Sequence, residues 1–72
     1  MKSHYIIEGD VVNLVGAKKR YSRLFYGTAE QAKNEVYKDG IMYQKHGFSD
    51  IRITFYRVTG MEYVDKYEYK GG

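Results

Sequence analysis

Residues 28–48 read TAEQAKNEVYKDGIMYQKHGF and contain the start, the buried side and the end of one predicted helix. Thr28 and Gln31 have the spacing of a capping box, in which each side chain binds a backbone amide at the start of a helix. Gly47 suits the left-handed residue that often ends a helix, and Phe48 follows at the position of the accompanying hydrophobic contact. These signals predict a helix over about residues 29–46.

The 3.6-residue period of this helix places mostly small side chains on one side: Ala29, Ala32, Val36, Gly40 and Tyr43. Such a stripe permits close approach to a sheet, and it leaves room for large side chains on the opposing strands. The alternative is a helix that breaks at Lys38-Asp39-Gly40, since glycine is a poor helix former. On the outer side, Tyr37 and Ile41 form an i,i+4 apolar pair that no local neighbour covers.

The rest of the sequence alternates as β-strands do, most clearly over residues 51–58 and 61–70. Residues 21–26 form a further strand, preceded by a turn at residues 16–19. Residues 4–15 are either one long kinked strand or two short strands that break at Gly9-Asp10. We therefore predict an α+β fold, an antiparallel sheet of four to five strands with one α-helix packed on one face, in the order β(β)β-α-β-β.

The 72 residues are expected to form a single domain, because half of this chain would be too short to bury a core. The Gly71-Gly72 tail is expected to fray. One helix with its side chains is about 10–12 Å wide, whereas four or five strands spaced by about 4.8 Å measure roughly 20 Å across. Either the sheet curls around the helix or part of one face stays uncovered. Both outcomes leave apolar area for a second chain.

The last hairpin has two alternative registers. A two-residue turn at residues 59–60 places Tyr56 opposite Tyr63 and leaves Tyr67 on the uncovered face. A three-residue loop with a left-handed Gly60 shifts the pairing by one residue and turns Tyr63 and Tyr67 toward the helix. We favour the three-residue loop because it exposes the charged side chains and buries no unpaired ion. These side chains are Glu62, Lys66, Glu68 and Lys70.

The composition excludes several kinds of site. The absence of cysteine rules out a disulfide scaffold, a thiolate zinc site and a thiol nucleophile. No serine lies in a nucleophile-elbow context, no phosphate-binding loop is present, and so short a chain can hardly enclose a pocket of about 300 Å³. We therefore expect a protein that is not an enzyme and that uses no cofactor or metal. No apolar run approaches the roughly 20 residues of a membrane span, so we expect a cytoplasmic protein without a membrane partner.

The clearest electrostatic feature is a basic cluster at or beside a predicted hairpin tip, formed by Lys18, Lys19, Arg20 and Arg23. The net charge of +3 permits an anionic partner without requiring one. Four such cations can contact phosphates or an acidic protein, or they can simply protect an edge strand from aggregation. Arg52 and Tyr56 would extend this cluster as a stacking surface for a nucleic acid.

The chain is short, lacks Cys, Pro and Trp, and is rich in Lys, Tyr and Ile. In this general style it resembles many small proteins of phages and other mobile elements, which often bind and block a host macromolecule. The resemblance implies a non-enzymatic binding protein that inhibits or modulates a host protein.

For this leading prediction we expect the contacts to involve the basic cluster together with Tyr37 and Ile41, because tyrosine offers a large contact area with few rotatable bonds. The first alternative is a DNA- or RNA-binding protein that uses the Lys18–Arg23 hairpin. The second is a self-assembling structural subunit, such as a homodimer.

Overall fold

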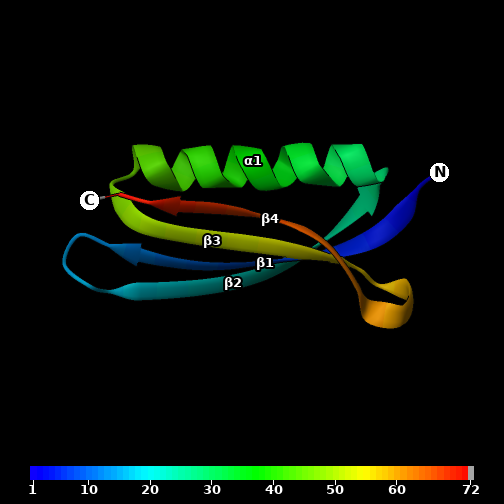
Figure 1. Cartoon of the computed structure of the whole chain (residues 1–72), viewed down its shortest axis with the longest axis horizontal. Coiled ribbons are helices and arrows are strands. Elements are labelled where there is room, and N and C mark those ends of the chain that lie inside the picture. Colours follow the sequence, from blue (N-terminus) through cyan, green and yellow to red (C-terminus); the bar gives the residue numbers. More distant parts are fainter. Residues whose placement is uncertain (72) are drawn as a thin grey trace.

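The computed structural model describes residues 1–71, in which four strands form one antiparallel sheet and one helix packs on one face of it (Figure 1). The elements along the chain are β1 (Ser3–Asn13), β2 (Lys18–Gly27), α1 (Ala29–Lys45), β3 (Phe48–Arg57), the short 3-10 helix η1 (Thr59–Met61) and β4 (Glu62–Lys70). The strand order across the sheet is β2-β1-β3-β4. This arrangement confirms the predicted α+β fold, and the first strand is one long element rather than two short ones.

The helix begins and ends where the sequence predicts. The Thr28 hydroxyl oxygen accepts a hydrogen bond from the Gln31 backbone N–H at 3.1 Å, and the Gln31 side-chain oxygen accepts one from the Thr28 N–H at 3.0 Å. At the other end Gly47 adopts a φ of 87°, the left-handed conformation that favours glycine. The helix continues through Gly40, so the alternative of a break at residues 38–40 is wrong.

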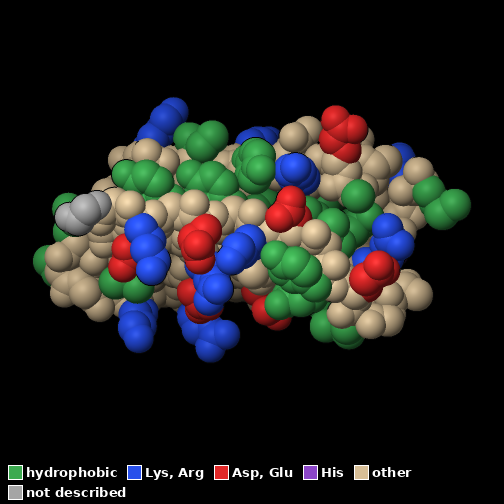
Figure 2. Space-filling model, in the orientation of Figure 1, with side chains coloured by type: hydrophobic (Ala, Val, Ile, Leu, Met, Phe, Trp, Pro, Cys, Tyr) green, Lys and Arg blue, Asp and Glu red, His purple; other side chains and the backbone are tan. Residues whose placement is uncertain are grey.

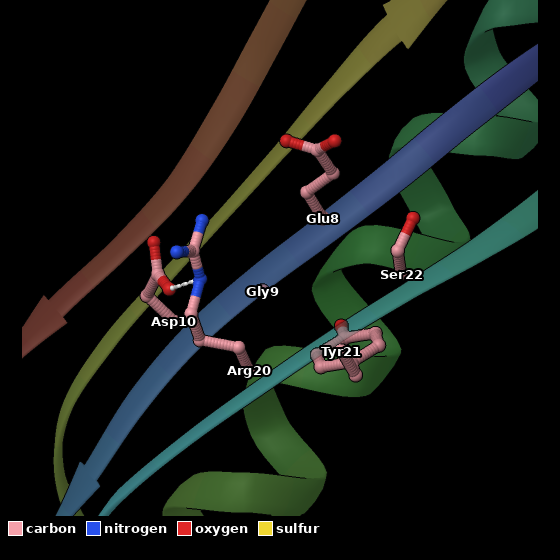
Figure 3. A pocket seen from close by; sticks show the side chains of 6 residues that line it. All are labelled: Glu8, Gly9, Asp10, Arg20, Tyr21 and Ser22. Carbon is pink, nitrogen blue, oxygen red and sulfur yellow. Dashed lines mark ion pairs between the residues drawn. The ribbon is translucent and has the colours of Figure 1, made fainter.

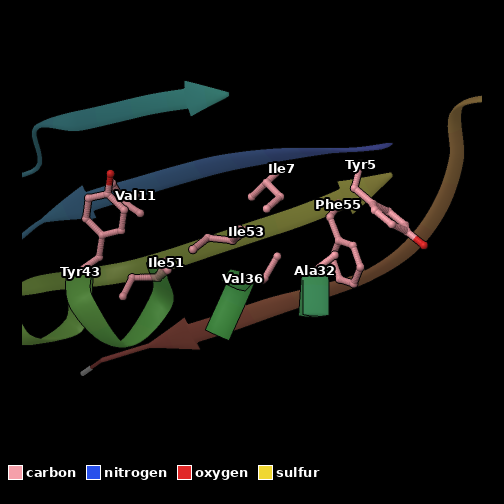
Figure 4. Close-up of a cluster of buried hydrophobic side chains, with 9 residues drawn as sticks. All are labelled: Tyr5, Ile7, Val11, Ala32, Val36, Tyr43, Ile51, Ile53 and Phe55. Atoms are coloured by element: carbon pink, nitrogen blue, oxygen red, sulfur yellow. The ribbon is translucent and has the colours of Figure 1, made fainter. Parts of the chain in front are cut away.

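The small-residue stripe of α1 lies on the sheet as predicted. Ala32, Val36, Gly40 and Tyr43 are buried. A Cβ atom added to Gly40 would overlap the ring of Tyr67 from β4, so the absence of a side chain makes room for that ring. The buried core that forms around this contact lies between α1 and the middle of the sheet (Figure 4). Its buried members are Tyr5, Ile7, Val11, Ala32, Val36, Tyr43, Ile51, Ile53 and Phe55.

The last hairpin combines features of both predicted registers, so the prediction of a single register is wrong. Next to the loop Tyr56 pairs with Tyr63, as in the two-residue turn, whereas farther along Ile53 pairs with Tyr67. A register shift after Tyr63 makes Val64 the extra residue of a β-bulge. Tyr63 therefore stays on the face away from α1, and Tyr67 lies beneath the helix. Gly60 is left-handed as predicted, with a φ of 75°.

The first hairpin turns earlier than predicted, at residues 14–17 rather than 16–19. Asn13 organises this turn, because its side-chain oxygen accepts hydrogen bonds from the N–H groups of Val15 at 3.0 Å and Ala17 at 2.9 Å. As a result Leu14 and Val15 form the hairpin tip, and they are 80% and 87% exposed. At the C-terminus, the Gly71 N–H donates to the Ser49 carbonyl oxygen at 2.6 Å, and Gly72 of the tail predicted to fray lies outside the described residues.

Candidate binding surface

The face of the sheet opposite α1 is called the open face here, because no other element of residues 1–71 packs on it. Side chains alternate between the two faces along a strand. In β1 the odd-numbered Tyr5, Ile7 and Val11 are buried toward α1, so the even-numbered residues point to the open face. Within residues 1–71 the open face is therefore without a covering helix or strand.

An apolar belt crosses the open face over all four strands. It consists of Leu24, Ile6, Tyr56 and Tyr63, which are direct neighbours in register from β2 through β1 and β3 to β4. Leu24 is 63% exposed and Tyr63 is 51% exposed. The rings of Tyr56 and Tyr63 meet edge to face with centroids 5.7 Å apart. Ile6 and Tyr56 on the two central strands are half-buried. The belt is thus a row of apolar side chains that is continuous across the sheet and most exposed at its two ends.

A row of charged side chains crosses the open face closer to the first hairpin. This charged row consists of Arg20, Asp10, Arg52 and Glu68, again direct neighbours from β2 to β4. Their signs alternate. Arg20 Nε lies 2.8 Å from Asp10 Oδ1, and Arg52 Nε lies 3.4 Å from Glu68 Oε2. Figure 2 shows blue and red side chains interleaved over this half of the molecule, with green side chains nearer to η1.

A shallow hollow of about 260 Å³ lies beside the charged row (Figure 3). Its charged and polar lining consists of Glu8, Asp10, Arg20 and Ser22. Asp10 and Arg20 lean toward one another from adjacent strands, so the strongest charges in the hollow neutralise each other. Within residues 1–71 no group of three or more acidic or histidine side chains is placed to hold a metal ion. The hollow therefore offers a small polar surface.

The predicted basic cluster is divided between the two faces. Lys18 and Arg20 point to the open face, where Arg20 is paired with Asp10. Lys19 and Arg23 point toward α1 instead. Lys19 Nζ lies 5.8 Å from the centroid of the Tyr43 ring. The four cations therefore do not form one continuous positive surface.

Arg23 belongs to a polar cluster that links β2 to α1. Its guanidinium group donates to Asp39 Oδ2 from Nε at 3.1 Å and from a terminal nitrogen at 2.9 Å. The Tyr21 hydroxyl donates to the same carboxylate oxygen at 3.0 Å. Burial raises the pKa of the Tyr21 hydroxyl well above its ordinary value, and the negative charge of Asp39 adds to this effect. The contacts of Arg23 are therefore internal and hold the helix against the edge strand.

The outer surface of α1 carries the second predicted contact. Tyr37 and Ile41 are exposed as expected, and Met42 extends the apolar surface beside them. The Tyr37 ring packs edge to face against Tyr67 with centroids 5.6 Å apart, so it is supported by β4. Ile41 and Met42 line a hollow of about 370 Å³ together with Lys38, Lys45 and His46. This surface is apolar with a basic rim.

Four of the open-face residues were candidate contacts from the sequence alone, namely Lys18, Arg20, Arg52 and Tyr56. The other members of the apolar belt were not. A signal for Ile6 was present, because Tyr5-Ile6-Ile7 is a run of three apolar residues in a strand and one of them must face away from the core. Tyr63 was placed beside Tyr56 only by the two-residue turn, which was not the favoured register. Leu24 had no comparable local signal, since both faces of β2 carry apolar or aromatic residues.

No helix within residues 1–71 combines the length and the apolar character needed to cross a bilayer. Comparison with protein-family models, with curated proteins and with solved structures finds no match for this chain.

Proposed function

We propose that this chain is a non-enzymatic protein whose role is to bind another protein chain through the open face of its sheet. The observation that carries the proposal is the apolar belt, in which Leu24, Ile6, Tyr56 and Tyr63 lie side by side across the open face, the first and last of them exposed and the middle two half-buried. Exposed apolar area of this kind is costly in water unless a partner covers it. Two of the four side chains are tyrosines, which are enriched at protein–protein contacts.

The distribution of charge favours a protein partner over a nucleic acid. A nucleic-acid surface needs free cations along one path, because phosphate contacts supply most of the affinity. Here Arg20 and Arg23 are each engaged with a carboxylate, and Arg20 and Arg52 alternate with Asp10 and Glu68 across the charged row. Mixed charge beside an apolar belt is instead typical of a protein interface with a polar rim.

The finer part of the proposal is that binding inhibits or modulates a host protein. It rests on the resemblance in composition to small proteins of mobile elements. Two further surfaces are available for such a contact, the outer helix surface around Tyr37 and Ile41 and the hairpin tip with Lys18 and Lys19. Occupation of a partner's surface is then the expected mode of action.

The test is a capture experiment that scores any protein partner. A tagged chain is co-expressed with an untagged copy, recovered from nuclease-treated lysate, and every retained protein is identified by mass spectrometry. We expect at least one protein, either a host protein or the untagged copy, to be retained by the wild type. Leu24→Lys should remove it by inserting a charge into the apolar belt.

The matched control is Leu14→Lys, which places the same charge on an exposed leucine at the other end of the same hairpin. If Leu14→Lys lowers the amount of captured protein and Leu24→Lys does not, the partner contacts the hairpin tip and not the belt. Retention that disappears after nuclease treatment would contradict the proposal and favour a nucleic-acid partner.

A further inference from the structure

We propose that the partner on the open face is a second copy of this chain, related to the first by a two-fold axis that runs parallel to the strands. This inference rests on the proposed function, because it names the partner of the same surface. The two sheets would stack face to face as a β-sandwich, with α1 of each copy on the outside. The order of apolar and charged side chains across the four strands supports this arrangement.

The two-fold axis determines which strands meet. The strand order is β2-β1-β3-β4, and rotation about an axis along the strands reverses that order on the opposing sheet. The edge strand β2 then faces β4 of the second copy, and β1 faces β3 of the second copy. Positions along the strands are unchanged by this rotation, so the apolar belt meets the apolar belt and the charged row meets the charged row.

The charged row is self-complementary under this rotation. Its signs run positive, negative, positive, negative from β2 to β4. Reversal of the row therefore places Arg20 opposite Glu68 of the second copy and Asp10 opposite Arg52 of the second copy, and each of these pairs occurs twice. A row with the signs in any symmetric order would instead bring like charges together. This row therefore has the order that an isologous contact requires. The next row toward the first hairpin is less favourable, because it places Lys18 on edge strand β2 opposite Lys70 on edge strand β4 of the second copy.

The belt is complementary as well. Leu24 lies opposite Tyr63 of the second copy, and Ile6 lies opposite Tyr56 of the second copy. A two-fold axis across the strands would reverse the positions along each strand. Fully overlapping sheets would then bring the apolar belt of one copy onto the charged row of the other, which leaves ions against apolar groups. The positions of the apolar belt and the charged row along the strands thus favour the axis along the strands.

The size of the face is compatible with a dimer of moderate affinity. Four strands at about 4.8 Å spacing and ten residues at about 3.3 Å rise give a face of roughly 19 Å by 33 Å, or about 600 Å² per copy. The total of about 1,200 Å² for both copies lies at the lower end of specific interfaces. The belt supplies apolar burial, whereas the charged row fixes orientation more than it adds affinity. The outer helix surfaces stay free for a host protein.

The test is sedimentation analysis of the purified chain and of variants that reverse one charge at a time, over about 1 to 500 µM. We expect the wild type to form a dimer. Asp10→Arg and Arg52→Asp should each raise the dissociation constant on the order of tenfold or more, because each places two like-charged pairs in the symmetric contact. An equimolar mixture of these two variants should restore association, since both facing pairs that involve residues 10 and 52 are again of opposite sign in the mixed dimer.

The control is Lys38→Asp, a reversal on the outer surface of α1 at a lysine that is paired with Glu35 at 3.2 Å. It should leave the dissociation constant unchanged, and its mixture with Asp10→Arg should not restore association. Circular dichroism checks that each variant is folded. These controls separate the facing pairs from a general effect of net charge.

A wild type that stays monomeric over the whole concentration range overturns the inference, and so does a mixture that associates no better than its components. The proposed function survives either result if the capture of a host protein still depends on Leu24. It fails with the inference if Leu24→Lys changes neither self-association nor capture.

Discussion

Gly40→Ala is expected to destabilise this protein although alanine is the better helix former. In an exposed helix this exchange stabilises by about 1 kcal/mol. Gly40 is buried, however, and a Cβ atom there would overlap the Tyr67 ring, with the ring atom Cζ only 2.8 Å away. The ring is held on two sides, because it packs against Tyr37 and its hydroxyl donates to the Gln44 side-chain oxygen at 3.3 Å.

The two effects oppose each other, and their sizes decide the sign. Forcing an extra carbon into a packed contact costs about 1–3 kcal/mol. After subtraction of the gain in helix propensity, the expected net loss is about 1 kcal/mol of unfolding free energy. For a domain of this size such a loss lowers the melting temperature by roughly 4–8 °C.

A second variant, which lacks the Tyr67 ring, tests whether the overlap with this ring causes the loss of stability. In Tyr67→Val the ring is absent, so Gly40→Ala should there stabilise the protein by about 1 kcal/mol. Urea denaturation of the wild type, the two single variants and the double variant gives a coupling free energy of about 2 kcal/mol if this reasoning holds. Equal effects of Gly40→Ala in both backgrounds, or stabilisation of the wild type, would refute the proposed contact.

Three further outcomes are expected. Thr28→Ala removes one half of the capping box and should lower the unfolding free energy by about 1 kcal/mol in urea denaturation, whereas a change below a few tenths would show that the cap is dispensable. Gly47→Ala forces a side chain into a left-handed conformation, so the same assay should show a loss of about 1–2 kcal/mol. Tyr21 has a folded-state pKa above the ordinary value of about 10, so its contribution to stability is complete below that pH and declines as the pH rises further. Tyr21→Phe should therefore remove a tyrosine ionisation well above pH 10 from an ultraviolet titration of the folded protein; an unchanged titration curve would contradict this assignment.

The helix shows how much local sequence can specify. Its capping box joins residues three positions apart, and its terminal glycine acts through its own backbone conformation, so both signals act within one or two turns. Local helix preference alone does not explain why α1 continues through Gly40. Glycine weakens a helix, and the space under the Tyr67 ring is the reason that this position holds no side chain.

The last hairpin shows a feature that local sequence preferences do not predict. Turn preference gave the correct pairing of Tyr56 with Tyr63, and polarity gave the correct side of the sheet for Tyr67, although its pairing with Ile53 belongs to neither predicted register. The bulge at Val64 satisfies both, because it leaves Tyr63 beside Tyr56 on the open face and still places Tyr67 beneath the helix. A strand pattern of period two has no place for an extra residue, so the alternation alone could not reveal it.

The amino-acid order alone specified the elements, their sequence along the chain and the mismatch between one helix and four strands, because these follow from short-range periodicity and from the widths of helices and strands. The binding surface was decided by the fold. Ile6, Leu24, Tyr56 and Tyr63 come from four strands and become neighbours only through the order β2-β1-β3-β4. Alternation along β2 divides the basic cluster between two faces, since consecutive residues of a strand point to opposite sides of the sheet.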